Sequence, residues 1–415
     1  MKRAVITGMG AITPIGNNVD DFWKNLIEGR SGAASITKFD TSNHKTKFAC
    51  EVKNFDPLLY VTKQEARKLD LYTLYALAAT EECMKDSGIN LDTCDLSKAG
   101  VILATGIGGI QTLEEEIIKY SENINSPRFS PFFITKMISN IAAGQISIKY
   151  GLHGVSYSVT SACASSNHAI ANALDFIRLG RANIILAGGS EATITQAAIG
   201  GFNSMKALST FNEFPGKASR PFDANRDGFV AGEGAGVLMI EELEHAKKRG
   251  AKIYCELAGY GVASDAFHVA ATHPEGLGAK IAMTDALNDA KITGDDVSYI
   301  NAHATSTPVG DISECLAIEN VFKDSLSRIQ ISSTKSMTGH LLGAAGAIES
   351  IACIKAIEQN VIPPTINLTE TDPDISAKLK LTPNNAIEKE VHVALNNTFG
   401  FGGHTSTTVF KKYKS

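Results

Sequence analysis

One cysteine stands where a strand is predicted to turn into a helix. Cys163 follows the apolar run Ser156 to Thr160 and a turn of small residues, and it precedes a helical stretch that closes at Gly180. Unpaired backbone N–H groups and the positive end of the helix dipole favour the reactive thiolate at such a position. The sequence therefore predicts a nucleophile on a strand–turn–helix elbow. The alternative is a buried cysteine that acts as a small hydrophobic residue, as we expect of the other cysteines.

A first histidine lies in a polar turn of the second part of the chain. The motif NAHATSTPVGD, residues 301–311, places His303 directly after an apolar strand, with Thr305 and Thr307 beside it and a helix start at Pro308. Such a polar cluster is costly inside a core unless it has partners, so His303 is a candidate for proton transfer or hydrogen bonding to a substrate. The alternative is a hydroxyl-rich turn with an ordinary hydrogen-bonded histidine.

A second histidine follows a lysine in SSTKSMTGHLLGAAGAIES, residues 332–350. Lys335 comes after a predicted strand, and His340 is predicted to open a helix rich in glycine and alanine. That helix has a poor intrinsic preference and needs close packing against another element. A helix N-terminus disfavours the protonated imidazole, so His340 should stay neutral and donate a hydrogen bond. Lys335 and Glu349 form either a supporting ion pair or an ordinary surface pair.

A glycine-rich turn near the end of the chain joins two predicted strands in NTFGFGGHTSTTVF, residues 397–410. Glycines permit backbone geometries that are closed to other residues, and such a turn can direct N–H groups at a developing oxyanion. Phe399 and Phe401 stand beside it as possible gates. The alternative is a simple hairpin turn.

The composition excludes several classes of function. The chain has 415 residues, 44% of them hydrophobic and 20% charged, with a net charge of −5 that shows no long block of one sign. Neither nucleic acid nor a membrane surface is an expected partner. The seven cysteines are scattered and the start MKRAVITGMG is no signal peptide, so we expect free thiols in a reducing cytoplasm. The glycine motifs match no nucleotide site and the histidines no zinc site, so we expect no cofactor and no metal.

Short Val/Ile-rich runs alternate with helical stretches along the whole chain, which indicates a layered α/β architecture. A boundary near residue 250 would divide it into residues 1–250, with insertions and the cysteine, and residues 251–415, with the histidines. VSYSVTSAC, residues 155–163, and VSYINAHAT, residues 297–305, are similar in pattern. A duplicated unit would place Cys163 and His303 at the same end of equivalent strands.

The motifs around these residues, together with ITGMGAITPIG, SPFF, AGGSEA and ASRPFDANRDGFVAGEGAG, resemble those of the elongating β-ketoacyl-acyl carrier protein synthases, most of all synthase II. The resemblance spans almost the whole chain. It implies a thiolase-like fold with two similar halves in a five-layered α-β-α-β-α arrangement, and a homodimer. It also implies a ping-pong reaction in which the cysteine takes an acyl chain from acyl carrier protein. Malonyl-carrier protein then loses CO2 and attacks the thioester.

The resemblance assigns a role to each motif. His303 and His340 would stabilise the enolate, and Lys335 and Glu349 would organise the site. The oxyanion hole would consist of the N–H groups of Cys163 and of an aromatic residue in the terminal turn, for which we select Phe399 over Phe401. The remaining implied residues contact the pantetheine arm, line the acyl tunnel or form a basic patch for the carrier protein: Thr305 and Thr307; Ile107 and Phe202; Lys63, Arg67, Lys68 and Lys206.

Two positions depart from the family pattern, because Ala304 replaces a common glycine and His404-Thr405 replaces Thr-Asn. Neither change removes a reacting group. A ketosynthase of a polyketide or aryl-polyene pathway is an open alternative to fatty-acid elongation. A non-catalytic chain-length subunit is disfavoured, since such subunits lack the nucleophile that Cys163 provides.

Overall fold

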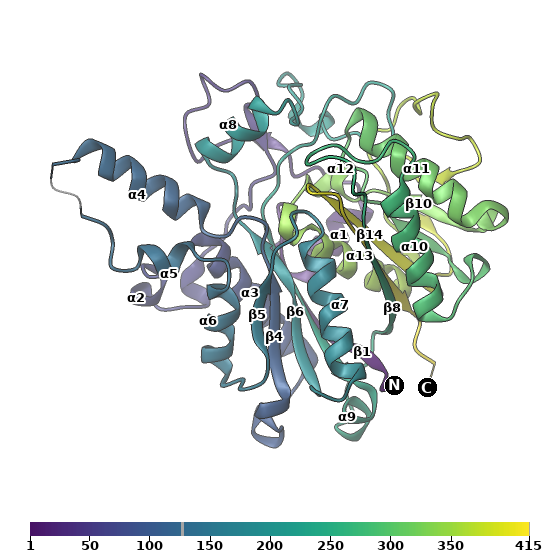
Figure 1. Cartoon of the computed structure of the whole chain (residues 1–415), viewed down its shortest axis with the longest axis horizontal. Coiled ribbons are helices and arrows are strands. Elements are labelled where there is room, and N and C mark those ends of the chain that lie inside the picture. The colour runs from purple at the N-terminus through teal and green to yellow at the C-terminus, as the bar shows by residue number, and fades with distance from the viewer. Residues whose placement is uncertain (126–127, 415) are drawn as a thin grey trace.

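The computed structural model of the chain describes residues 1–125 and 128–414 (Figure 1). Within this part, the main sheet runs through eleven strands in the order β12-β10-β9-β14-β15-β8-β1-β7-β6-β4-β5. The strands of the first half are β1 (Ala4–Ile12), β4 (Ala99–Ala104), β5 (Ser156–Val159), β6 (Ile184–Glu191) and β7 (Gly234–Glu242). Those of the second are β8 (Cys255–Ser264), β9 (Tyr299–Asn301), β10 (Gln330–Ser332), β12 (Lys380–Leu381), β14 (Val393–Gly400) and β15 (His404–Lys411).

The two halves of the sheet repeat one topology. The first half is ordered β1-β7-β6-β4-β5 and the second β8-β15-β14-β9-β10, so corresponding strands occupy corresponding places. The directions also agree, since β4 lies parallel to β5 and β6 while β9 lies parallel to β10 and β14. A short antiparallel pairing of β1 with β8 joins the halves. The predicted duplication is therefore confirmed.

One detail of that prediction is wrong. The similar segments 155–163 and 297–305 contain β5 and β9, which are not equivalent strands. The counterpart of β5 is β10, and the counterpart of β9 is β4. Both segments simply combine a short β-strand with a polar turn at its carboxyl end, a pattern that many α/β strands share.

Helices make the layers above, between and below the two half-sheets. Helices α3 (Leu71–Ser87) and α6 (Ile141–Tyr150) cover the first half-sheet, and α10 (Leu277–Ala290) packs on β8 and β15 beside α11 (Pro308–Phe322). Between the half-sheets lie α7 (Ser165–Arg178) and α13 (Ala345–Gln359). Residues Ala345 to Ile357 of α13 are all buried, which explains their small and apolar side chains. The five-layered α-β-α-β-α architecture is confirmed.

The remaining elements are a projecting arm and a set of short helices, strands and turns. In Figure 1, α4 (Ile110–Glu122) and α5 (Phe133–Met137) project from the body as an arm. None of the helices in the described residues is long and apolar enough to cross a membrane. The other short elements are α1 (Val19–Ile27), α2 (Lys63–Ala66), α8 (Gln196–Ser204), α9 (Leu243–Lys248), α12 (Lys335–Thr338), β2 (Ala34–Ser35), β3 (Phe48–Ala49), β11 (Val361–Ile362), β13 (Ile387–Glu388) and the 3-10 turns Pro57–Leu59, Leu91–Thr93, Leu96–Lys98, Pro215–Lys217, Gly294–Asp296, Lys323–Arg328 and Leu342–Ala344.

Candidate active site

The cysteine elbow forms between β5 and α7, as the sequence predicts. Ala162 has φ 52°, a left-handed conformation that costs an alanine about 1–3 kcal/mol and that the surrounding structure must enforce. The Oγ of Ser165 accepts from the Ser161 N–H (2.8 Å) and donates to the Ala162 carbonyl (2.6 Å). These bonds hold the strained turn and place Cys163, only 7% exposed, two residues before the first helical residue.

Cys163 lies in one cluster with both predicted histidines. The Nε2 atom of His340 lies 2.9 Å from the Cys163 Sγ, and the imidazole ring of His303 lies against that of His340 with 5.3 Å between centroids. The rings are nearly perpendicular, at 85°. A third ring, of Phe229, packs edge-on against His340 at 5.4 Å. Residues that are far apart in the sequence thus form one buried thiol–imidazole cluster.

His340 does not open a helix, contrary to prediction. It forms a bridge with Ala231, because its N–H donates to the Val230 carbonyl (2.7 Å) and its own carbonyl accepts from the Gly232 N–H (2.9 Å). A 3-10 turn follows, and α13 begins only at Ala345. The bridge to Ala231, which lies in the first half of the chain, fixes the backbone at His340 so that its ring points at Cys163.

The two imidazoles are neutral because they are buried. Burial, and next the charge of Lys335, lower the pKa of His340 well below its ordinary value. The same two causes, followed by His340, lower the pKa of His303. The predicted neutral state of His340 is present, but burial rather than a helix end accounts for it. A neutral imidazole can donate a hydrogen bond without carrying charge into the site.

Burial also acts on the thiol, in the direction opposite to the one predicted. Loss of water around Cys163 raises the pKa of its thiol to about 12, against the lowering effects of Lys335 and of the Phe401 N–H. The resting cysteine is therefore a thiol rather than the thiolate expected at a helix start. Its proton must leave when the sulfur attacks a carbonyl.

A carboxylate that sequence reasoning missed holds the His303 turn. Glu314 of α11 accepts from the N–H groups of His303 (2.9 Å) and Ala304 (2.7 Å), and from the Asn397 side chain (3.0 Å). Glu314 is buried within the mostly apolar stretch DISECLAIENVF, and a carboxylate next to the apolar run Cys315–Ile318 is the signal that could have revealed it. Ala304 is not among the residues with positive φ, so its methyl group causes no backbone strain.

A second missed carboxylate holds the loop after β4. Glu191, the last residue of β6, accepts from the N–H groups of Gly106 (2.7 Å), Ile107 (3.2 Å) and Gly343 (2.9 Å). A Cβ on Gly343 would lie 2.1 Å from the Gly106 nitrogen, so only glycine lets the loop after His340 come this close. Burial raises the pKa of Glu191. The residue lies in the family-like motif AGGSEA, to which we had assigned no role.

Lys335 and Glu349 form a buried ion pair beneath the histidines. Lys335 begins α12 and contacts Glu349 of α13, and both side chains are 1% exposed. The alternative of a surface pair is therefore wrong. Removing one partner of such a pair would leave the other as an uncompensated buried charge.

The glycine-rich hairpin β14–β15 approaches the elbow at Gly400. A Cβ at this position would lie 2.9 Å from both the Cys163 nitrogen and the Ser161 oxygen, so a side chain would separate the two elements. The backbone N–H of Phe401 makes a hydrogen bond to the Cys163 thiol. Phe399 pairs with Thr405 in the hairpin and packs its ring against His303 at 5.6 Å. The N–H of Phe401 thus acts on the sulfur, which favours Phe401 over the predicted Phe399 as the oxyanion donor.

Phe202 and Ile107, the two residues predicted to line the acyl tunnel, lie in different surroundings. Phe202 packs on Phe229 with ring centroids 5.3 Å apart, in an apolar cluster that also contains Cys163 and Leu342. Ile107 is 44% exposed in the single chain, although its N–H is bound by Glu191. The apolar space beside the thiol is therefore lined by Phe202 but is not closed off by Ile107 within one chain.

The other predicted residues lie near the surface. The hydroxyls of Thr305 and Thr307 are 3.2 Å apart on the half-buried turn that follows His303. All four basic residues of the predicted carrier patch are exposed. Figure 1 shows α2 and α8 at separate places, so Lys206, which follows α8, does not join the basic side chains on and just after α2 in one cluster.

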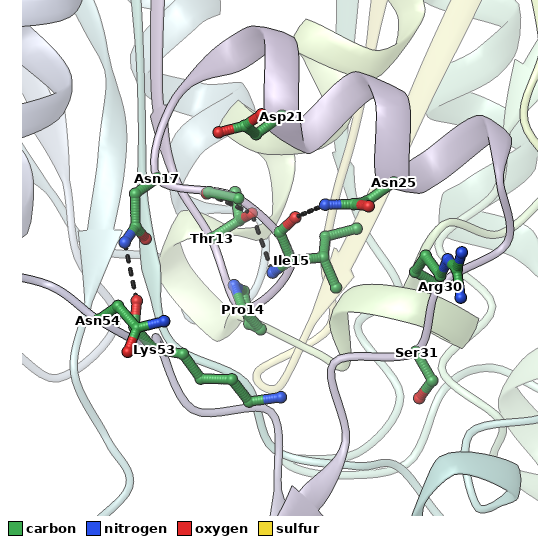
Figure 2. A pocket seen from close by; sticks show the side chains of 11 residues that line it. Thr13, Pro14, Ile15, Asn17, Asp21, Asn25, Arg30, Ser31, Lys53 and Asn54 are labelled. Atoms are coloured by element: carbon green, nitrogen blue, oxygen red, sulfur yellow. Dashed lines mark hydrogen bonds between the residues drawn. The ribbon is translucent and has the colours of Figure 1, made fainter.

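A polar pocket of about 430 Å³ lies elsewhere, at the turn between β1 and α1 (Figure 2). Asn17, Asp21 and Asn25 line it on one side and Arg30 and Lys53 on the other. None of its lining residues belongs to the thiol–imidazole cluster. It contributes nothing to the site described above.

Comparisons with known proteins agree with this geometry. Models of the β-ketoacyl synthase N-terminal and C-terminal domains match residues 1–246 and 254–369. The chain is 45% identical to 3-oxoacyl-acyl-carrier-protein synthase 2 of Synechocystis sp., over all of this chain and 99% of the relative. It is 44% identical to the Vibrio harveyi protein of the same name, over 99% of both chains. A solved structure described as a type II polyketide synthase acyl-carrier protein in complex with its ketosynthase, bound to the hexaketide, matches with a TM-score of 0.91 and 34% identity over 100% of both chains. With this fold, and with a cysteine and two histidines brought together from its two halves, the chain belongs to the β-ketoacyl synthase family.

Proposed function

We propose that this acyltransferase elongates fatty acyl chains by decarboxylating condensation between an acyl and a malonyl group, both carried on acyl carrier protein. The observation that carries the proposal is the contact of the Cys163 thiol with His340 (2.9 Å), whose ring in turn packs against that of His303. A hydrolase would pair its nucleophile with a base that activates water. Two neutral, buried imidazoles beside a thiol instead suit the stabilisation of an enolate.

In the first step, Cys163 takes the acyl chain. Its sulfur attacks the carbonyl carbon of the acyl thioester, an S–C bond forms, and the bond to the carrier sulfur breaks. The proton of the Cys163 thiol passes to the departing carrier sulfur. His340 Nε2, at 2.9 Å, is the base positioned to relay it. The N–H groups of Cys163 and Phe401 stabilise the oxyanion of the tetrahedral intermediate.

In the second step, malonyl-carrier protein loses CO2 and leaves an enolate. His303 and His340 each donate a hydrogen bond to the thioester oxygen on which the charge gathers. For this donation the proton of each neutral ring lies on Nε2, so His340 changes tautomer after the acyl transfer, during which its Nε2 is unprotonated. The Nδ1 atoms of both rings have no partner among the described residues. The enolate carbon then attacks the acyl-Cys163 carbonyl and a C–C bond forms. Cys163 leaves as a thiolate and is protonated from solvent.

We assign supporting roles to the other residues of the site. Lys335 and Glu349 form a buried ion pair that positions the two imidazoles, and the charge of Lys335 helps to keep them neutral. Thr305 and Thr307, half-buried on the turn after His303, would contact the pantetheine arm. Phe202 lines the apolar space for the acyl chain, and the ring of Phe401 would gate access to it.

We propose that the active form is a homodimer. Strand β5 pairs with β4 on one side, and within the described residues its other edge is free. An unpaired edge strand can pair with a second copy across a twofold axis. A second copy seated there would also cover Ile107 and close the acyl tunnel. Nearby elements expose apolar side chains on the arm and on α6: Leu113, Ile117, Ile118, Phe129, Phe132, Ile134 and Ile148.

The carrier protein would dock on the exposed side chains of Lys63, Arg67, Lys68 and Lys206. These cations complement the acidic carrier protein, and in a dimer the patches of two chains could act together. All seven cysteines are free thiols, which fits a reducing, cytoplasmic location.

The proposal is tested with purified protein and acyl-carrier proteins of graded chain length. Mass spectrometry should detect an acyl adduct on Cys163, and addition of malonyl-carrier protein should convert it to a 3-oxoacyl product two carbons longer. Absence of an adduct at every chain length would refute the proposal. Polyketide precursors on their own carrier protein form the comparison arm, because a structural neighbour at 34% identity is a polyketide ketosynthase. Preference for those precursors would replace fatty-acid elongation by polyketide synthesis.

A further inference from the structure

A third histidine, outside the thiol–imidazole cluster, contacts the elbow from the other side. His168 lies in the first turns of α7, and its Nδ1 is 2.6 Å from the Oγ of Ser161. Ser161 forms a bridge with Cys163 across the strained Ala162. The imidazole is therefore bonded to the residue on which the geometry of the elbow depends.

The same ring reaches the glycine-rich hairpin. Burial, and next the neighbouring His404 of β15, lower the pKa of His168 to about 4, and the backbone of Thr405 acts against this shift. The ring is therefore neutral, so that one nitrogen can donate a hydrogen bond and the other can accept one.

The residues on either side of the His168 ring belong to the cysteine elbow and to the β14–β15 hairpin, the two elements that must meet. Thr405 lies opposite Phe399 in the β14–β15 ladder and follows the turn that carries the Phe401 N–H. Gly400 of that hairpin packs directly on the Ser161 carbonyl and the Cys163 nitrogen. The ring of His404 lies edge-on to that of His168, with 6.4 Å between the ring centroids.

We propose that His168 is a positioning residue that locks the cysteine elbow to the glycine-rich hairpin, so that the N–H groups of Cys163 and Phe401 point at one oxyanion. The inference rests on the proposed function. An oxyanion hole built from two separate elements loses rate when their spacing changes by a fraction of an ångström. His168 spans that spacing with its hydrogen bond to Ser161 on one side and its edge-on contact with His404 of the hairpin on the other.

The test compares His168→Ala, His168→Asn and His168→Gln with the wild-type enzyme. Asn keeps a hydrogen-bonding group near the Nδ1 position for Ser161, and Gln keeps one near the Nε2 position. We expect His168→Ala to slow both the acylation of Cys163 and the condensation by about 10- to 100-fold. Each of the other two variants should lose nearly as much, because the lock needs both ends. His392→Asn, at an exposed histidine, is the matched control and should stay at the wild-type rate.

Two readouts separate positioning from general loss of structure. Decarboxylation of malonyl-carrier protein depends on His303 and His340, and alkylation of Cys163 by iodoacetamide needs no oxyanion hole; both should stay within about threefold of wild type in the variants. Ser161→Ala combined with His168→Ala should be no slower than His168→Ala alone, because the two residues act through one bond.

Other results would overturn the inference. Acylation and condensation within about threefold of wild type, or an equal loss in decarboxylation and alkylation, would show that His168 only supports the fold. If His168→Ala does not fold, the Asn and Gln variants carry the same test. Failure of the wild-type enzyme to acylate Cys163 would refute the proposed function instead, so the two failures are distinguishable.

Discussion

The two halves of the molecule carry different chemistry at corresponding places. After β5 the chain makes the strained elbow of Cys163, and after its counterpart β10 it makes the short helix α12 with Lys335 and then His340. After β4 a loop is held by Glu191, and after its counterpart β9 the His303 turn is held by Glu314. The topology thus provides equivalent strand ends, and the residues placed there divide the reaction. In the function we propose, the first half holds the acyl group, and the second stabilises the enolate.

The largest expected effect comes from removing the thiol of the first half. Cys163→Ala should abolish the acyl adduct and lower condensation by at least about 1000-fold, because the proposed site has no other nucleophile that can carry the acyl chain. Decarboxylation of malonyl-carrier protein should persist, since the histidines of the second half perform it. Mass spectrometry and CO2 release measure the two activities. Loss of both together would mean that the halves do not divide the reaction.

The second test removes a hydrogen-bond donor from the other half. His303→Ala should lower decarboxylation and condensation by about 100- to 1000-fold, the usual effect of losing one donor to a developing charge. Cys163 should still take up the acyl chain, which intact-protein mass spectrometry would show. A variant that could no longer be acylated would place His303 in the first step as well.

The third test compares the two carboxylates that hold the corresponding loops. Glu191→Ala leaves three N–H groups without this acceptor, and Glu314→Ala leaves those of His303 and Ala304. Each should lower the free energy of unfolding by about 3 kcal/mol or more, at about 1–3 kcal/mol for each orphaned group. Urea denaturation measures the loss, with the exposed Glu244→Ala as control. A loss in one variant only would show that one loop is held by other contacts.

The fourth test concerns pH and the seam between the elbow and the hairpin. Burial lowers the pKa of His168 from 6.5 to about 4, so the unfolded chain binds more protons between these values. Stability from this group is present above pH 6.5 and is lost as the pH falls through about 4, by at most about 3 kcal/mol. His168→Gln should therefore flatten the acid limb of the unfolding free energy. An unchanged acid limb would contradict the neutral, buried state of the ring.

The smallest effect is expected at the departure from the family pattern. Ala304→Gly should lower the free energy of unfolding by about 0.5–1 kcal/mol, through the greater freedom of glycine in the unfolded chain. Condensation should stay near the wild-type rate, because Ala304 has no positive φ to relieve. A clear gain in rate would show that its methyl group distorts the His303 turn.

Much of the site could be predicted from the sequence because its chemistry lies at strand ends. The run from β5 through Cys163 to the end of α7 combines β-branched residues, small turn residues and a glycine stop, and each signal is local. The sequence predicted that Lys335 and Glu349 form either a supporting ion pair or a surface pair, and the structure buries that pair. Glu191 and Glu314 were missed because their function is to accept backbone N–H groups, which leaves no pattern in the side chains of their partners.

The sequence by itself determined the layered α/β class, the three motifs that carry the thiol and the imidazoles, and the glycine-rich turn, because strand and turn preferences are local. Tertiary structure decided the rest. Burial keeps Cys163 protonated and the histidines neutral, since the loss of water outweighs a helix end, and burial cannot be read at a single position. Only the assembled hairpin favours the N–H of Phe401 over that of Phe399 as the oxyanion donor, because its direction depends on how the turn packs at Gly400.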